Sequence, residues 1–216
     1  MNILIVSGGQ VYKDQLMAIW EREAPYVIGV DHGCITLISL GLKPDLAVGD
    51  FDSVTEEERP SLDRLLSDPL VRSEVLIPEK DDTDTEHALR LAIDMKPEKI
   101  LMFGCTGTRL DQTVSSIMLL RLAVEAEIPC FIQDMNNRIR VGRGKTILKR
   151  DELFGRYVSV LPYGNEARHL TISGFKYDVE DYNLEAREGR GISNELLSDT
   201  GVIESGDYYI IMETVD

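Results

Sequence analysis

The chain has 216 residues, of which 43% are hydrophobic and 28% charged, which is ordinary for a globular protein with one large or two small domains. Its formal net charge of −15 argues against nucleic acid and anionic membrane surfaces as partners, and no segment has the roughly 20 apolar residues of a membrane span. Three widely spaced cysteines without a CxxC pair favour a reducing cytoplasm over a disulfide framework. A nucleotide would bind such an acidic chain only where cations reverse the local field, which predicts a carboxylate-rich, metal-loaded pocket.

The first 133 residues alternate short apolar runs with helical patterns. The apolar runs predict buried strands at residues 3–6, 26–30, 46–48, 75–77, 100–103 and 130–133. Apolar residues spaced by three and four predict amphipathic helices around residues 12–20, 88–95 and 110–122, the last with a buried face of Leu110, Val114, Ile117, Met118 and Leu122. This alternation predicts an α/β fold with a mostly parallel, Rossmann-like sheet covered on both faces.

The pattern changes from about residue 136. Short alternating runs such as 157–161 and 208–212 are separated by turn residues, which predicts a smaller antiparallel β domain. The segment 136–149, with its two glycines, is the candidate boundary. We therefore expect domains at residues 1–135 and 136–216.

Polar motifs follow four of the predicted strands directly. Ligands of open parallel sheets bind at the carboxyl ends of the strands, so these motifs are expected to meet at one edge. They are Asp31, residues 49–53 (GDFDS), residues 80–84 (KDDTD) and residues 104–111 (GCTGTRLD).

The acidic residues of these loops predict a magnesium site. Asp50 and Asp52 alternate in one short loop, and Mg²⁺ prefers oxygen ligands. An isolated DxD pair is a weak signal, since most are solvated, but Asp82 and Asp84 add a second acidic cluster. Either Asp82 or Thr83 is also expected to cap the helix that follows, with Asp84 facing the site.

The glycine-containing segment 104–111 leads into a helix, whose backbone N–H groups suit a phosphate. Arg109 is the side chain best placed to neutralise charge on a transferred phosphoryl group, and a surface ion pair with Asp111 is the alternative. Lys80 either holds a phosphate or is simply solvated.

Taken together and in order, these motifs resemble the thiamine pyrophosphokinase family. The resemblance covers most of the first 120 residues, and the second half resembles the family's thiamine-binding β domain more loosely at residues 173–177 and 191–195. Gln112 stands where the family often has histidine, and His32 where a small residue is common. The blocks that carry the resemblance are residues 30–33, 44–45, 49–53, 80–84 with 88–89, and 107–111.

The resemblance implies transfer of diphosphate from ATP to the hydroxyl of thiamine, giving thiamine diphosphate and AMP. It also implies an α/β domain that binds ATP and Mg²⁺, a C-terminal β-sandwich that binds thiamine, and a homodimer with shared active sites. The expected residues are Asp50, Asp52 and Asp84 on Mg²⁺ with Asp82 in reserve; Asp31, Lys80, Thr83, Gly107, Arg109 and Asp111 on ATP; and Tyr177, Ser193 and Asn194 on thiamine.

Three other functions stay open from the residues themselves. The α/β motifs fit a diphosphokinase that acts on another small alcohol, such as a pterin. A non-catalytic nucleotide-binding protein would need the fold without the dense carboxylates, and the acidic loops alone would suit a metal-dependent phosphohydrolase. Release of AMP with and without thiamine separates these functions.

Overall fold

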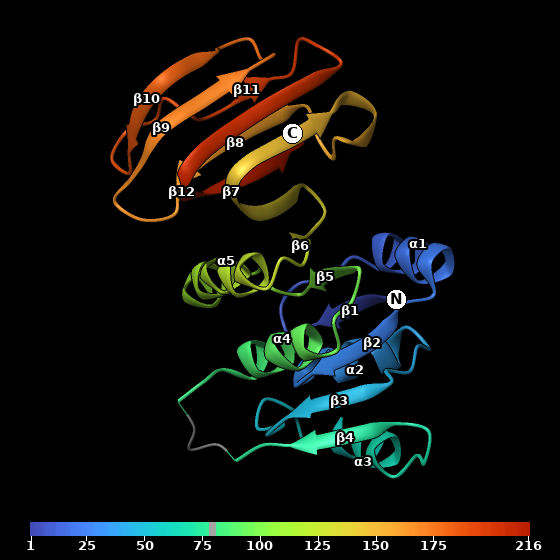
Figure 1. Ribbon diagram of the computed structural model, residues 1–216. Helices are drawn as coiled ribbons and strands as arrows, with labels where there is room; N and C mark the ends of the chain where they lie inside the picture. Colours follow the sequence, from blue (N-terminus) through green and yellow to red (C-terminus); the bar gives the residue numbers. More distant parts are fainter. Residues whose placement is uncertain (78–80) are drawn as a thin grey trace. The chain divides into compact units, whose positions relative to one another are not determined.

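The computed structural model describes residues 1–77 and 81–216, so Lys80 lies outside the described residues. The chain divides into two compact units, Met1–Cys130 and Phe131–Asp216 (Figure 1). The fold class expected from the sequence is confirmed: an α/β unit with a parallel sheet is followed by a smaller antiparallel β unit. Within the described part of the chain, no helix is both long and apolar enough to cross a membrane.

In the part of the first unit that the structure describes, five parallel strands lie in the order β5-β1-β2-β3-β4. The central strands are almost completely buried, because helices cover the sheet and their apolar runs need no polar face. The strands are β1 (Asn2–Val6), β2 (Tyr26–Val30), β3 (Leu46–Gly49), β4 (Arg72–Val75) and β5 (Lys99–Phe103).

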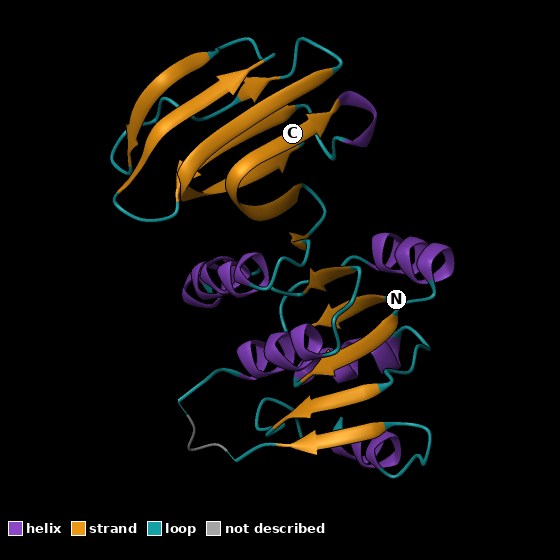
Figure 2. Ribbon diagram, viewed as in Figure 1, coloured by secondary structure: helices purple, strands orange, loops and turns teal. Residues whose placement is uncertain are grey.

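Within the described residues, five helices connect and cover these strands. α2 packs against α3, while α4 packs against α5 and over β1, β2 and β3, and Figure 2 shows α4 on the opposite side of the sheet from α2 and α3. The helices are α1 (Lys13–Glu23), α2 (His32–Ser39), α3 (Arg59–Leu66), α4 (Asp84–Asp94) and α5 (Leu110–Glu125).

Two sequence predictions in this unit were wrong in detail. The fourth strand lies at Arg72–Val75 rather than at residues 75–77, and Val75 and Ile77 are 65% and 69% exposed. The strand is at the edge of the sheet, so the apolar run was not a buried core. On α5 the expected buried residue Ile117 is buried, but Leu110, Val114 and Met118 are exposed, and the helix also buries Ser116, Leu120 and Ala123.

The second unit is an antiparallel arrangement organised around one long strand, β12 (Thr200–Thr214). The first part of β12 pairs with β9, its last part pairs with β8, and β7 pairs with both parts across an irregularity between Ser205 and Tyr209. A strand that changes partners at a bulge turns the corner between two layers. The other strands are β6 (Cys130–Gln133), which begins at the unit boundary, β7 (Asn137–Lys149), β8 (Tyr157–Pro162), β9 (Glu166–Ser173), β10 (Val179–Glu185) and β11 (Asn194–Glu195).

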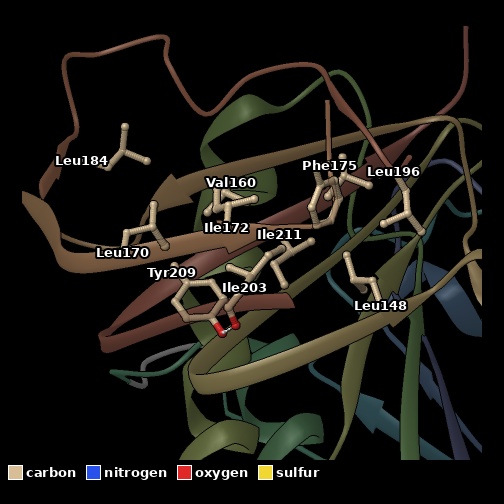
Figure 3. Close-up of a cluster of buried hydrophobic side chains, with 11 residues drawn as sticks. Leu148, Val160, Leu170, Ile172, Phe175, Leu184, Leu196, Ile203, Tyr209 and Ile211 are labelled. Carbon is tan, nitrogen blue, oxygen red and sulfur yellow. Dashed lines mark hydrogen bonds between the residues drawn. The ribbon is translucent and has the colours of Figure 1, made fainter. Parts of the chain in front are cut away.

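Tyr209 fills the corner of this unit. It is completely buried beside Ile203 and Ile211, and its hydroxyl donates to the Ile203 carbonyl at 3.1 Å (Figure 3). A side chain at Gly142 would overlap the Tyr209 ring. Of the two glycines in the expected boundary segment, Gly142 therefore allows β7 to pack on Tyr209, and Gly144 adopts a φ of 69° that favours glycine.

A glycine in α2, Gly33, allows this helix to pack closely against the end of strand β1. A Cβ atom at Gly33 would overlap the carbonyl oxygen of Val6 at the end of β1. We expect Gly33→Ala to lower the free energy of unfolding by about 1–3 kcal/mol, because backbone atoms yield poorly to overpacking. Urea unfolding measures this change. Gly164→Ala is the control, since no atom lies within 4 Å of its added Cβ, and equal unfolding midpoints for the two variants would contradict this prediction.

Candidate active site

A pocket of about 500 Å³ lies at the carboxyl ends of the strands of the first unit. It reaches the point between β1 and β5 where the strand order reverses, which is the usual ligand position in such sheets. Every strand-end motif found in the sequence contributes to its lining. The lining comprises residues 7–9 after β1, 30–32 after β2, 50 and 52–53 after β3, 82–85 at the start of α4, 104–109 after β5, and 112, 113 and 116 of α5.

Three carboxylates converge in this pocket. One oxygen from each of Asp31, Asp50 and Asp84 lies within 4.8 Å of the other two. The loops that carry them are held in unusual backbone conformations: Asp31 has φ 50° and Phe51 has φ 58°. The Phe51 N–H donates to Asp31 Oδ1 at 3.0 Å, which ties the β2 loop to the β3 loop. Such strained positions are typical of functional sites.

Gly49 allows this close approach. It has φ 148°, and a Cβ atom there would overlap Asp31 Oδ1. The glycine of the GDFDS segment therefore lets the Asp31 carboxylate lie directly against the backbone of β3. This explains the glycine before the acidic pair in structural terms.

Burial and neighbouring negative charge act together on Asp31. Loss of solvent, followed by the negative charges of Asp84 and Asp50, raises the pKa of its carboxyl from 3.8 to about 6, although the Phe51 N–H opposes the rise. Three carboxylates in so small a space repel one another. The residues present fit a hard divalent cation, since each offers an oxygen and a cation would relieve this repulsion.

The other acidic residues expected on the metal occupy different positions. Asp52 and Asp82 line the same pocket but do not belong to the group of three converging oxygens. The Asp52 N–H donates to Asp50 Oδ1 at 3.1 Å, so it helps to orient Asp50. The sequence had placed Asp31 near the nucleotide rather than with the metal ligands.

The first turn of α4 carries Asp84 and is anchored on both sides. Thr83 is the N-cap, and its hydroxyl oxygen accepts from the Glu86 N–H at 3.1 Å. The Thr85 hydroxyl lies 3.0 Å from the hydroxyl of Ser7 at the end of β1. This turn therefore holds the Asp84 carboxylate on a fixed helix terminus.

The glycine-containing segment after β5 forms another part of the pocket lining. Gly107 and Arg109 line the pocket, and Arg109 occupies the N-cap position of α5. Arg109 Nη2 lies 2.7 Å from Asp111 Oδ2, with both side chains about two-thirds exposed. The surface ion pair weighed in the sequence is thus present, yet the guanidinium is at the rim of the pocket.

Sequence reasoning missed the segment that follows β1. Ser7, Gly8 and Gly9 line the pocket, and a Cβ atom at Gly9 would overlap backbone oxygens of Gly104 and Thr106. The Gly9 N–H donates to the Gly104 carbonyl at 2.8 Å, so the two loops pack directly against each other. The signal was present, since SGG directly follows the predicted strand at residues 3–6.

A second pocket of about 530 Å³ lies within the second unit. Tyr177 and Asn194 line it, together with Arg190, whose guanidinium lies 4.3 Å from the centre of the Tyr182 ring. Ser193 is exposed, with φ 58°, and is not among the lining residues.

Asn194 is buried, and its side-chain amide is hydrogen-bonded to the protein backbone. Its Oδ1 accepts from the Tyr177 N–H at 3.0 Å, and its Nδ2 donates to the Tyr177 carbonyl at 2.9 Å. Asn194 therefore fixes the backbone of the Tyr177 segment beside the second pocket.

The parallel sheet and its polar strand-end pocket define an α/β protein with a ligand site in the position typical of this architecture. The family model "Thiamin pyrophosphokinase, catalytic domain" matches residues 16–132, and "Thiamin pyrophosphokinase, vitamin B1 binding domain" matches residues 145–210. The chain belongs to the thiamin pyrophosphokinase family.

Similar proteins span its whole length. A thiamine pyrophosphokinase of Bacillus subtilis is 34% identical over 212 residues, covering 98% of this chain and 97% of that protein. The crystal structure of thiamine pyrophosphokinase from Bacillus subtilis superposes with a TM-score of 0.88 at 32% identity, covering 100% of both chains. That of thiamin pyrophosphokinase from Geobacillus thermodenitrificans gives 0.85 at 29% identity, covering 100% of this chain and 98% of the other.

Proposed function

We propose that this protein is a thiamine diphosphokinase, which transfers diphosphate from ATP to the hydroxyl of thiamine and releases thiamine diphosphate and AMP. The observation that carries this function is the match of both halves of the chain to the two domains of one family, over nearly its full length. In this reaction a bond forms between the thiamine hydroxyl oxygen and the β-phosphorus. The bond between that phosphorus and the oxygen bridging to the α-phosphorus breaks, AMP leaves with that oxygen, and the hydroxyl proton is released to solvent.

The pocket of the first unit is proposed as the ATP site. Backbone N–H groups at the start of α5, near Gly107, suit phosphate oxygens. Arg109 would leave Asp111 and neutralise charge on the transferred diphosphate. Phosphoryl transfer depends mainly on such alignment and charge neutralisation. Thr83 and Asp111 would orient the nucleotide, and Lys80 remains proposed on sequence alone.

Magnesium would be held by the converging carboxylates. We assign Asp50 and Asp84 as ligands, in agreement with the sequence, and add Asp31 because its oxygen lies in the same group. Asp52 and Asp82, which line the same pocket, would accept hydrogen bonds from water bound to the cation. When bound, Mg²⁺ supplies positive charge that binds and polarises the phosphate oxygens.

The second pocket is proposed to contribute to the recognition of thiamine. The exposed ring of Tyr177 offers an aromatic face for a cationic heterocycle. Ser193 would supply a short hydrogen-bonding side chain next to it. Asn194 acts on the ligand through Tyr177, because its amide is bonded to the Tyr177 backbone.

We expect Asn194→Ala to raise the thiamine KM by roughly tenfold, because it releases the backbone N–H and carbonyl of Tyr177. The ATP KM should stay nearly unchanged. Ser193→Ala should raise the thiamine KM less and leave stability unaltered. Steady-state kinetics with each substrate varied in turn measures both. Equal increases in the two KM values would indicate general damage and contradict the assignment.

Two further properties belong to the proposal. The chain would form a homodimer with shared active sites, and it would act in the cytoplasm, where its three free, buried cysteines stay reduced. An acceptor panel tests the function itself. AMP should appear with thiamine, and not with a pterin alcohol or with water alone. AMP release without any acceptor would favour a hydrolase, and binding without turnover a nucleotide sensor.

A further inference from the structure

His87 links the acidic wall of the ATP pocket to the edge strand of the sheet. It lies in α4, one turn after Asp84. Its Nε2 is 2.7 Å from Glu74 Oε1 on β4, and its Nδ1 is 3.4 Å from Asp82 Oδ2. The imidazole of His87 thus connects Glu74 on β4 with Asp82, which precedes α4. Of these three residues, only Asp82 lines the pocket.

Asp82 lies just before the start of α4, next to other residues that line the pocket. Asp82 directly precedes Thr83, the N-cap of α4, and Asp84 follows. Thr85 ties the same turn to β1 through Ser7 at 3.0 Å. The turn is therefore held to β1 by Thr85 and to β4 by the Glu74–His87–Asp82 chain.

Because the three side chains are only partly buried, the Glu74–His87–Asp82 contacts add little to the free energy of unfolding. Their main effect is to restrict the conformation of Asp82. The side chains of His87, Glu74 and Asp82 are 27%, 42% and 32% exposed. Ion pairs at such exposure contribute little to folding, but they limit the rotamers that a short loop side chain can adopt. A restraint on Asp82 therefore acts on a residue that lines the pocket and lies two positions before Asp84, one of the three converging carboxylates.

We propose that His87 is a positioning residue, which uses Glu74 to hold Asp82 and the first turn of α4 in the arrangement that receives a magnesium–nucleotide complex. The inference rests on the proposed function of the pocket. His87 itself does not line the pocket, so it acts through Asp82.

Binding of a non-hydrolysable ATP analogue with Mg²⁺, measured by calorimetry on the full chain without thiamine, tests this inference. His87→Ala should weaken binding about 5- to 20-fold, at the low end of what the loss of a hydrogen bond to a charged group costs, because His87 acts only through Asp82. Its thermal unfolding should change little. The ATP KM should rise by a similar factor, whereas kcat at saturating nucleotide should change less than about twofold.

A double-mutant cycle shows whether the effect passes through Asp82. Asp82→Asn combined with His87→Ala should bind the analogue no more weakly than Asp82→Asn alone. Full additivity of the two losses would overturn the positioning role. Glu74→Gln should weaken binding in the same direction without altering α4, and it serves as the test if His87→Ala does not fold.

His169 offers a matched control. Its Nδ1 lies 2.6 Å from Asp181 Oδ1 in the second unit, so His169→Ala breaks a comparable His–Asp contact between residues that do not line the ATP pocket. Its analogue affinity should equal that of the wild type. If the wild-type protein binds no magnesium–nucleotide complex, the proposed function is contradicted. If the wild type binds it and a folded His87→Ala variant binds it equally well, only the positioning role of His87 is overturned.

Discussion

Replacing Asp84 by asparagine is expected to lower thiamine diphosphate formation by at least about 10²–10³-fold while making the ligand-free protein more stable at neutral pH. Asp84 is one of three converging carboxylates, so the change removes a charge proposed to bind magnesium. The same charge is, after burial, the largest contribution that raises the pKa of Asp31. Loss of activity with a gain in stability distinguishes a functional carboxylate from a structural one.

The stability gain has a defined pH dependence. Because the pKa of Asp31 rises from 3.8 to about 6 on folding, its ionisation destabilises the folded protein as pH rises through 6. A rise of two pKa units corresponds to about 3 kcal/mol at most, and burial and solvent screening leave about 1 kcal/mol to the Asp84 charge. Asp84→Asn should therefore unfold at higher urea concentration at pH 8 and show little gain at pH 4.5.

Asp94→Asn, at the other end of α4, makes the same change of charge outside the carboxylate cluster. It should retain wild-type activity. Near wild-type turnover of Asp84→Asn at saturating Mg²⁺ would remove Asp84 from the metal site. A stability gain that is equal at both pH values would show that the Asp31–Asp84 repulsion is not its cause.

Removal of Arg109 is expected to have an effect of similar size. Arg109→Ala should lower kcat about 10²–10³-fold, because a group that neutralises developing charge is lost from the pocket rim. Arg109→Lys should recover only part of the rate, since an ammonium cannot form the two parallel bonds of a guanidinium. Stability should change little, because the ion pair with Asp111 is exposed.

Arg121 provides the control for this variant. It forms an ion pair with Glu125 at 2.7 Å on the same helix, outside the pocket. Arg121→Ala should keep full activity. If Arg109→Ala loses no more activity than Arg121→Ala, Arg109 is only the partner of Asp111 at the surface.

The strand-end argument was the most informative part of the sequence. It required only apolar runs followed by polar residues, and it brought Asp31, Asp50 and Asp84 to one edge, where the structure also has them. Their grouping could not be derived from spacing, because it depends on φ 148° at Gly49 and φ 50° at Asp31. These angles follow from tertiary packing and leave no periodic signal.

Where the predictions were wrong, tertiary context decided the outcome. Val75 and Ile77 form an apolar run that β4, as the edge strand, leaves exposed. On α5, Ser116 is buried and lines the pocket, whereas Val114 is 58% exposed, so apolar spacing alone did not identify the buried face of this helix. The role of Asn194 as a bond to the Tyr177 backbone likewise needed the structure.

The most direct test of the central claim is the product balance of the purified protein with ATP, Mg²⁺ and thiamine, followed by ³¹P NMR. The account predicts thiamine diphosphate and AMP in equal amounts, with no ADP or free diphosphate and no reaction when thiamine is omitted. Formation of ADP and thiamine monophosphate, or of AMP and diphosphate without thiamine, would contradict diphosphate transfer as the function of this chain.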